Sequence, residues 1–299
     1  MRKKLCVTVV GLGILLASAY QSIASMSQLE IKKIEDGVKK MKGESTGVRQ
    51  QGYKELRDIG ANCAPYVAEA LTDKLVVSPS KVMMCDLLGE LKSKEALPAL
   101  TATLRNQSPA IRAAAARAIG SVADLSSIEP LVGLLADEDP HVREAAIDSL
   151  AAVNANEAPR ITQLLKDEQE NVRVAAIKFL NGRKDTATIQ DIREAFTKDK
   201  SGNVRAIAAR TIGEMKDTAA VDALMIAVIE DPDNFVREEC AASLGAIRDS
   251  KALPALIEAL KDDYKDIQLK AASSLKEMTG QDFGKDYEKW LNWYASNKK

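Results

Sequence analysis

A pattern that recurs along most of the chain constrains its fold more than any other feature. The copies begin at Val48, Ser80, Ile111, Val142, Val172, Val204, Val236 and Ile267, which gives a period of roughly 31. Eight residues after each start stands Leu56, Leu88, Ile119, Leu150, Leu180, Ile212, Leu244 or Leu275. Two residues that are eight positions apart lie on the same face of a helix, because eight residues make slightly more than two turns. A helix this short cannot bury its apolar face alone, so the copies must stack on one another.

Each copy continues into a second amphipathic helix. In the stretch 236–263, the leading helix carries Val236, Cys240 and Leu244 at helical spacing, and Leu253 and Leu256 follow in the second helix. Proline occupies the first turn of several second helices, where a missing N–H costs nothing: Pro65, Pro98, Pro159 and Pro254. Two-helix units of this length predict an all-α array.

The period, the V-R-x-x-A-A-x-x-L-G core and the proline together resemble the HEAT-repeat family in its short bacterial form, over about residues 48–278. This resemblance implies a right-handed α-solenoid of about eight two-helix repeats. We assign the array to residues 47–279. Such repeats serve many partners, so the family indicates architecture more strongly than function.

Residues 1–24 predict a secretory signal peptide. Arg2, Lys3 and Lys4 precede the apolar stretch 5–17, and small residues would permit cleavage after Ala19 or Ala24. We therefore expect export to the periplasm or cell envelope of a bacterium, with no membrane insertion after cleavage. The alternative is an uncleaved segment that anchors the chain in the inner membrane.

Segments at both ends of the array are expected to cap it. Residues 25–46 predict a capping helix, in which Ser27 and Glu30 have the spacing of a capping box. Residues 280–299 are rich in aromatic side chains, and we expect these to cover the exposed end of the core. The alternative is that they form a docking patch for a partner.

The charge balance argues against nucleic acid as a ligand. The chain has 42 basic and 43 acidic residues, and removal of Arg2, Lys3 and Lys4 leaves 39 against 43, a net charge of −4. Nucleic-acid binding favours a basic surface, and anionic lipid favours a polybasic segment. We expect a monomer that binds a protein or peptide.

Few residues are available for catalysis or metal binding. His141 is the single histidine, and no phosphate-binding glycine loop or nucleophile elbow is present. Cys63 and Cys85 fall on neighbouring helices, and the sequence leaves open whether they form a disulfide. Cys240 falls in a core column and is expected to be an inert thiol. We expect no cofactor, no metal and no enzymatic activity.

A row of cations marks the second residue of the leading helices: Arg49, Lys81, Arg112, Arg143, Arg173, Arg205 and Arg237, with Gln268 in the last copy. We predict that the arginines form a structural ladder, each bonding to an acid or a helix-end carbonyl of the neighbouring repeat, for example near Asp139 or Asp233. The alternative is a basic stripe for an anionic ligand. The fifth copy carries Arg183 at an otherwise apolar position, which predicts a local change in curvature.

The partner-binding surface is predicted on the second helices, which we expect to line the concave side. The candidate contacts follow the central apolar residue of each second helix: Glu69, Thr101, Gln163, Arg193, Glu194 and Glu258. Their mixed chemistry favours a protein or peptide over a repeated small ligand. The predicted function is a non-enzymatic protein-binding scaffold. The alternatives are an accessory or lyase-like enzyme related to the bilin-attachment proteins that share these repeats, and a membrane-anchored scaffold.

Overall fold

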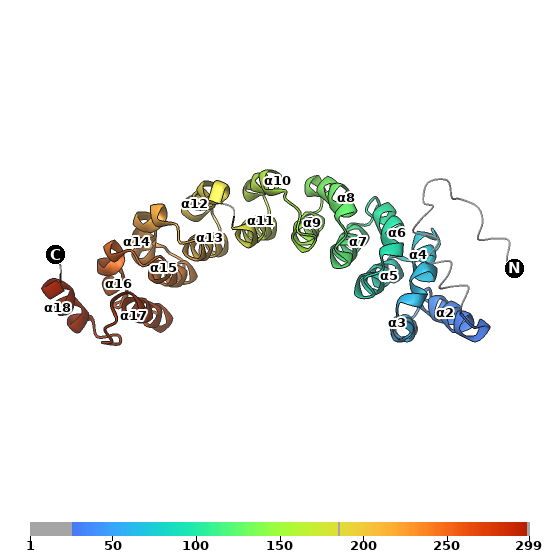
Figure 1. Ribbon diagram of the computed structural model, residues 1–299, viewed down its shortest axis with the longest axis horizontal. Helices are drawn as coiled ribbons and strands as arrows, with labels where there is room; N and C mark the ends of the chain where they lie inside the picture. The colour runs from blue at the N-terminus through green and yellow to red at the C-terminus, as the bar shows by residue number, and fades with distance from the viewer. Residues whose placement is uncertain (1–25, 185, 298–299) are drawn as a thin grey trace. The chain divides into compact units, whose positions relative to one another are not determined.

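The computed structural model describes residues 26–184 and 186–297, and all regular secondary structure in these ranges is helical. The predicted signal peptide lies outside the described residues. Helices alternate between a leading and a second helix in each copy, which makes the chain an α-solenoid, as predicted (Figure 1). None of the helices that the structure describes is both long and apolar enough to cross a membrane.

Each leading helix begins within two residues of the predicted start of its copy. The leading helices are α3 (Thr46–Ile59), α5 (Ser78–Glu90), α7 (Pro109–Val122), α9 (Pro140–Ala152), α11 (Glu170–Arg183), α13 (Gly202–Glu214), α15 (Asn234–Ile247) and α17 (Lys265–Thr279). The second helices are α4 (Ala64–Thr72), α6 (Leu97–Thr103), α8 (Ile128–Val132), α10 (Ala158–Gln163), α12 (Ile189–Lys198), α14 (Val221–Glu230) and α16 (Leu253–Ala259). The third and fourth second helices continue as the 3-10 turns η4 (Gly133–Ala136) and η5 (Leu164–Lys166).

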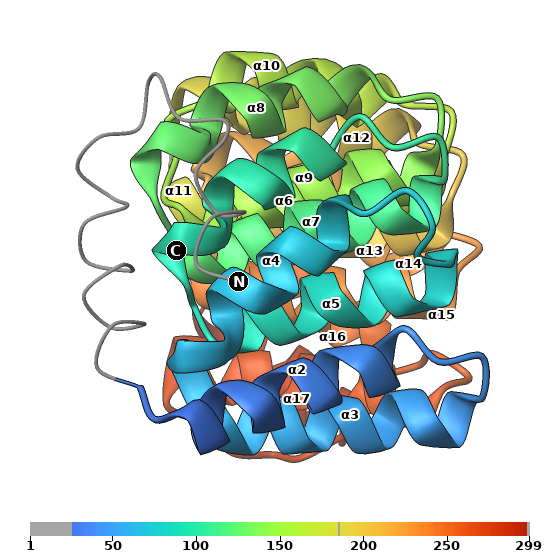
Figure 2. The same cartoon turned by 90° about the vertical axis from the view of Figure 1, so that its right-hand side faces the viewer.

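The helices form two compact units, with the boundary between Asn156 and Glu157 in the fourth copy. Unit 1 contains the helices up to α9, and unit 2 contains those from α10 onward. Within each unit, the leading helices form one layer and the second helices form another (Figure 1), and Figure 2 shows the helices lengthwise.

The core lies between the two layers. The predicted central column is fully buried from Leu56 to Leu275. The residues four positions after each start, such as Ala115, Ala146 and Cys240, are also fully buried. Full burial of one leucine or isoleucine stabilises a fold by roughly 1.5–3 kcal/mol. Because every copy contributes such a residue, the stabilisation that comes from burying apolar side chains is distributed evenly along the array.

Neighbouring leading helices approach most closely where a glycine faces a serine. A Cβ atom on Gly213 would lie 2.7 Å from the Cα of Ser243, and a Cβ on Gly245 would lie 2.6 Å from the Cβ of Ser274. The hydroxyl of Ser243 donates to the Ala209 carbonyl at 2.8 Å, across the same helix pair. The glycine at the end of the L-G motif is therefore a contact position between repeats, which the sequence had not indicated.

This close approach places the leading helices on the inner side of the bend within each unit, and the second helices on the outer side (Figure 1). Helices that touch through glycine and serine lie closer together than helices separated by larger side chains. The prediction that the second helices line the concave side is therefore wrong. The outer layer carries all six candidate contacts: Glu69, Thr101, Gln163, Arg193, Glu194 and Glu258.

The N-terminal end of unit 1 carries the predicted helix, α2 (Gln28–Met41). The Ser27 backbone N–H donates to the Glu30 carboxylate at 2.8 Å, and the Glu30 N–H donates to the Ser27 hydroxyl at 3.2 Å, so the capping box is present. Helix α2 packs against α3, where a Cβ on Gly52 would lie 2.6 Å from the Gly37 carbonyl oxygen.

The aromatic segment forms α18 (Tyr287–Asn297), which packs against α16 as the second helix of the eighth copy. Trp290 is fully buried, with its ring 4.9 Å from Phe283 and 6.0 Å from Trp293 in edge-on geometry. Its indole N–H donates to the Gly284 carbonyl at 2.8 Å. Trp290 is therefore the core residue of α18.

Candidate functional site

The ladder arginines of unit 2 form ion pairs with aspartates at the ends of second helices. Arg205 donates to both carboxylate oxygens of Asp231, at 2.9 and 2.7 Å, and its Nη1 group donates to the Asp199 carbonyl at 3.0 Å. Asp199 in turn accepts from Arg173 at 2.7 and 2.9 Å. Arg237 repeats the arrangement on Asp262, at 2.7 and 3.3 Å.

The aspartates of the ladder also hold the turns into the next leading helix. Asp231 accepts the backbone N–H of Asp233 at 2.9 Å. Asp233 and Asp139, near which the partners of the ladder were predicted, are instead N-caps that accept from backbone N–H groups two residues on. Arg112 and Arg205 pair with Asp137 and Asp231, which lie two residues before these caps and in the arginine's own repeat, whereas the helix-end carbonyl that Arg205 contacts, that of Asp199, belongs to the neighbouring repeat as predicted.

In unit 1, Arg112 shows the same arrangement, whereas Arg49 bonds to a backbone carbonyl and a hydroxyl. Arg112 binds Asp137 through two hydrogen bonds of 2.8 and 2.7 Å, and Arg143 donates to the Asp137 carbonyl at 2.7 Å. Arg49 donates to the Gly43 carbonyl at 3.0 Å and to the Thr46 hydroxyl at 2.9 Å. In the last copy of unit 2, Gln268 donates to the Asp262 carbonyl at 2.6 Å and keeps this backbone contact.

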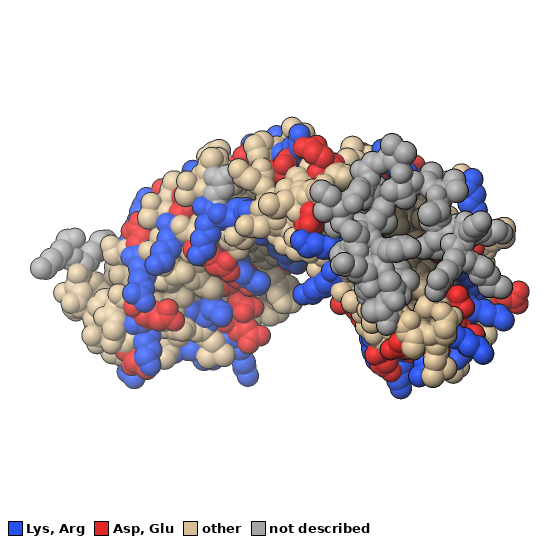
Figure 3. All heavy atoms as spheres, turned by 45° about the vertical axis from the view of Figure 1, so that its right-hand side comes forward, with Lys and Arg blue, Asp and Glu red and all other residues tan. Residues whose placement is uncertain are grey.

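Electrostatics couples the two partners of each rung. Burial alone raises the pKa of Asp262, but hydrogen bonds from Arg237 and from the Tyr264 N–H outweigh it and hold that pKa below its ordinary value. The hydrogen bonds to Asp262 raise the pKa of Arg237. A carboxylate thus neutralises the guanidinium. On the face drawn in Figure 3, acidic and basic side chains are interspersed, and neither sign forms a stripe.

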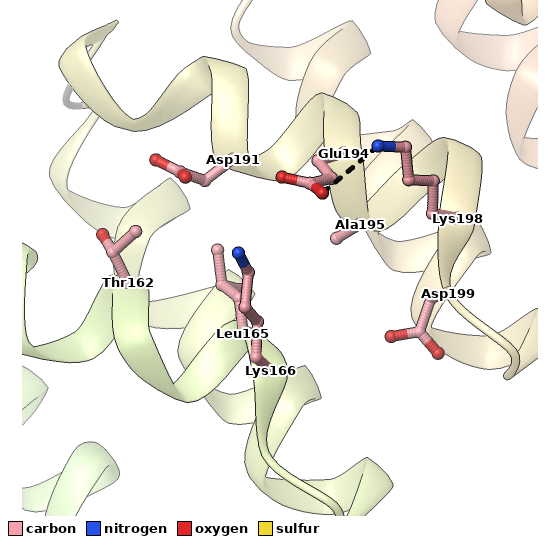
Figure 4. Close-up of a pocket in the computed structure, with 8 residues that line it drawn as sticks. All are labelled: Thr162, Leu165, Lys166, Asp191, Glu194, Ala195, Lys198 and Asp199. Atoms are coloured by element: carbon pink, nitrogen blue, oxygen red, sulfur yellow. Dashed lines mark hydrogen bonds and ion pairs between the residues drawn. The ribbon is translucent and has the colours of Figure 1, made fainter.

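Three grooves open between neighbouring second helices of unit 2. The groove between α10 and α12 has a volume of about 160 Å³ and is lined by Thr162, Lys166, Asp191 and Glu194, among others. Figure 4 shows the side chains of these two helices facing one another across it. The groove between α12 and α14 has about 450 Å³, and the groove between α14 and α16 about 280 Å³. Arg205 and Arg237 of the ladder line these last two grooves.

Two of the predicted contacts line these grooves. Glu194 faces the first groove and forms an ion pair with Lys198 at 3.3 Å, and Glu258 faces the third and pairs with Lys261. Gln163 of α10 is exposed, whereas Arg193 is half-buried and pairs with Asp217 at 3.0 Å. In unit 1, Glu69 of α4 is exposed and Thr101 of α6 is half-buried.

The structure adds an apolar surface that was not predicted. On α14, Ile226 is 59% exposed and Ile229 is 47% exposed, and they line the second and third grooves respectively. Ile226 lies two residues after the buried Leu224, which is the relation that Glu194 has to Ile192. An isoleucine in a largely apolar helix looks like a core residue, so its exposure had to come from the structure.

The remaining reactive side chains of the described chain are not assembled into a site. Cys63, Cys85 and Cys240 are free, buried thiols, and burial raises the pKa of Cys63 to about 11 and that of Cys85 to about 12. His141 is at the surface, 3.8 Å from Glu144. Among residues 26–184 and 186–297, no three His, Cys, Asp or Glu side chains gather in a way that could hold a metal ion.

The repeat period and the two-layer packing of helices agree with the comparison to known families. The family model described as HEAT repeats matches residues 79–151, 129–207 and 189–276. The chain belongs to the HEAT-repeat family. These matches lie within the array predicted from the sequence.

One curated relative is the bilin biosynthesis protein PecE of Mastigocladus laminosus, which is 33% identical over 129 residues. The match covers 41% of this chain and 48% of PecE, so the chain spans about half the length of that relative. The prediction that this HEAT-repeat protein is not an enzyme is contradicted by the relative, which is named as a bilin biosynthesis protein.

Solved structures agree on the fold. YibA of Escherichia coli superposes with a TM-score of 0.63 at 19% identity, covering 90% of this chain and 99% of YibA. An engineered protein superposes with a TM-score of 0.52 at 18% identity, covering 87% of this chain and 77% of the engineered one. At such identities the likeness concerns the fold alone.

Proposed function

We propose that this HEAT-repeat protein binds a protein partner through the second-helix face of unit 2, centred on α14, in the periplasm or cell envelope. The observation that supports this proposal most directly is the exposure of Ile226 and Ile229 between two grooves. Exposed apolar side chains beside grooves are typical of surfaces that another protein covers. The flanking grooves would receive side chains of the partner.

The position of this surface in the array supports the proposal. The neighbouring second helices carry Glu194 and Glu258 where α14 carries Ile226. The core does not require an apolar side chain at this position, because the glutamates occupy it in repeats of the same fold. A solvent-facing isoleucine costs solubility, so a binding role is a physical reason for its presence.

Site-specific crosslinking tests the proposal. A photoreactive amino acid at position 226 should yield a protein adduct in intact cells, whereas the same amino acid at Glu277, on the opposite layer of unit 2, should not. The partner recovered from the adduct should then bind the purified protein, and Ile226→Asp should weaken that binding about tenfold or more. Equal crosslinking at both positions, or unchanged binding by the variant, would reject the site.

Export rests on residues 1–24 alone, with their basic start and apolar stretch. Cell fractionation followed by intact-mass measurement tests it. A periplasmic protein whose mass corresponds to cleavage after Ala19 or Ala24 would support export. A full-length mass in the cytoplasmic fraction would reject it, and a full-length mass in the membrane fraction would favour the anchored alternative.

The similarity to PecE favours a second candidate, in which the chain takes part in bilin attachment as a lyase or as a subunit of one. Incubation of the purified protein with a linear tetrapyrrole tests this candidate. A shift of the visible absorption band, and transfer of the pigment to an acceptor thiol, would support it. An unchanged spectrum at tetrapyrrole concentrations well above that of the protein would reject it.

A further inference from the structure

We infer that the partner segment that docks on α14 is an amphipathic helix whose apolar stripe is bordered by lysine or arginine on the side that faces α16. This inference rests on the proposed function and adds the chemistry of the partner. It depends on two features of unit 2: the direction of the apolar stripe on α14, and the sign of the charges beside it.

The apolar stripe runs along the axis of α14. Ile226 and Ile229 are three residues apart, about 4.5 Å along the helix axis. Ala223 and Ala227 lie beside them, on the wall of the groove toward α12. The opposite side of α14 is buried through Val221, Leu224 and Val228. A stripe parallel to the axis matches a second helix that lies along α14 with its own residues at i, i+3 and i+4.

The grooves on both sides of α14 suit this arrangement. Helices pack at about 8–10 Å by placing ridges of side chains into grooves, and α14 has an open groove toward each of its neighbours. Small side chains at Ala223 and Ala227 leave room for larger side chains of the incoming helix. The two isoleucines form the central ridge of the contact.

Acidic side chains border the stripe on the side of α16. Glu258 and Asp263 line the groove between α14 and α16 together with Ile229, whereas Glu194 lines the groove between α10 and α12. Glu230, next to Ile229, is also exposed. Lys261 pairs with Glu258, so the three carboxylates of Glu230, Glu258 and Asp263 face one ammonium group, while on the side of α12 Lys198 lines the groove and pairs with Glu194.

The other charges near the stripe are compensated. Arg205 and Arg237 on the groove walls bind Asp231 and Asp262, and Lys251 binds Asp222 at the start of α14. Surface pairs such as Glu258–Lys261 contribute little, about 0–1 kcal/mol, so a cation from the partner can replace the lysine at small cost. Charge complementarity therefore selects a partner with basic residues beside its apolar stripe.

Synthetic helices of about 18 residues provide the probe, since shorter isolated helices form poorly. One peptide carries a leucine stripe bordered by lysines, and a second carries the same stripe bordered by glutamates. Fluorescence anisotropy should show that the full-length protein binds the lysine peptide about tenfold more tightly than the glutamate peptide. Binding of the lysine peptide should weaken as salt is raised, because the Debye length falls to about 3 Å at 1 M.

Variants locate the contact. The double variant Ile226→Asp/Ile229→Asp should lose binding of the lysine peptide, and Glu258→Gln/Asp263→Asn should weaken it several-fold and flatten its salt dependence. The matched control, Asp266→Asn/Glu277→Gln, makes the same charge change on exposed positions of α17 and should bind like the parent. Circular dichroism of each variant checks that the fold is kept.

The outcomes separate this inference from the proposed function. Equal affinity for the two peptides, or a loss of binding in the α17 control equal to that in the Glu258→Gln/Asp263→Asn variant, would overturn the inferred chemistry. If crosslinking at position 226 still captured a partner that binds directly, the proposed function would stand without it. If neither peptide bound and no adduct formed, both would fall.

Discussion

The contact between Gly213 and Ser243 gives the sharpest test of how the leading helices are held together. An added Cβ on Gly213 would lie 2.6 Å from the Ser243 hydroxyl oxygen and 2.7 Å from its Cα. Real Cβ contacts are longer, and the Cα belongs to the backbone of α15, so rotation of a side chain cannot relieve the overlap. Gly213→Ala must therefore push α13 and α15 apart.

The cost can be estimated from three terms. Overpacking of a well-packed contact costs about 1–3 kcal/mol. Displacement of the Ser243 hydroxyl from the Ala209 carbonyl costs about 1 kcal/mol. Alanine in place of a helical glycine returns up to about 1 kcal/mol through its higher helix propensity. Gly213→Ala should therefore lower the free energy of unfolding by about 1–3 kcal/mol.

Gly182 provides the matched control. It also lies in a leading helix, but a Cβ at that position would meet no atom within 4 Å. Gly182→Ala should therefore raise the free energy of unfolding by a few tenths of a kcal/mol, roughly 0.5, since only the propensity term applies. Urea denaturation followed by circular dichroism measures both variants against the parent.

A second substitution completes a double-mutant cycle. Ser243→Gly removes the Cβ and hydroxyl that the new methyl group would meet, so it should restore part of the loss in the Gly213→Ala background, with a coupling of about 1 kcal/mol or more. If Gly213→Ala were as stable as Gly182→Ala, or if the two substitutions were additive, close approach would not be what positions the leading helices.

Three further predictions concern the ladder and the thiols. Arg205→Ala should lower the free energy of unfolding by about 3 kcal/mol, since it leaves the largely buried Asp231 unpaired. Lys276→Ala breaks an exposed ion pair with Asp282 and should change the free energy of unfolding by less than about 1 kcal/mol. The pKa of Asp262 is lowered in the folded chain, so its ionised form stabilises the fold fully above about pH 4 and this stabilisation is lost as the pH falls toward the folded pKa. In urea titrations at pH 5, 4 and 3, Asp262→Asn should therefore show a smaller fall in the free energy of unfolding with decreasing pH than the parent. At pH 8 the buried thiols of the folded chain should react slowly with a thiol reagent. After unfolding without reductant, a chain that lacks Cys6 should have three reactive thiols, and a count of one reactive thiol would reveal a Cys63–Cys85 disulfide.

The sequence predicted the repeat architecture well because the apolar columns have a physical cause. Leu244 and its equivalents must be buried in every copy, so the period remains visible without coordinates. The bend was predicted in the wrong direction because it depends on the relative spacing of two layers. That spacing follows from pairs such as Gly245 and Ser274, which lie about one repeat apart in sequence and gain meaning only when the helices are stacked.

The last helix and the apolar surface show two further limits of pattern reading. The aromatic side chains around Trp290 suggested a separate cap, although α18 occupies the place of a regular second helix. Ile226 was passed over for the opposite reason, since it resembles the core residues beside it. Periodicity ranks positions by side-chain type, whereas exposure depends on which face of α14 meets the leading layer.

The ladder of unit 2 has a consequence for how this part of the chain opens. Each aspartate accepts an arginine of its own repeat through its carboxylate and, through its backbone carbonyl, a side chain of the next repeat: Asp199, Asp231 and Asp262. Unfolding one repeat would therefore break bonds to both of its neighbours. In amide hydrogen exchange, α13 and α15 should exchange together at a common slow rate, as one cooperative block, while the solvent-facing end of α18 exchanges earlier.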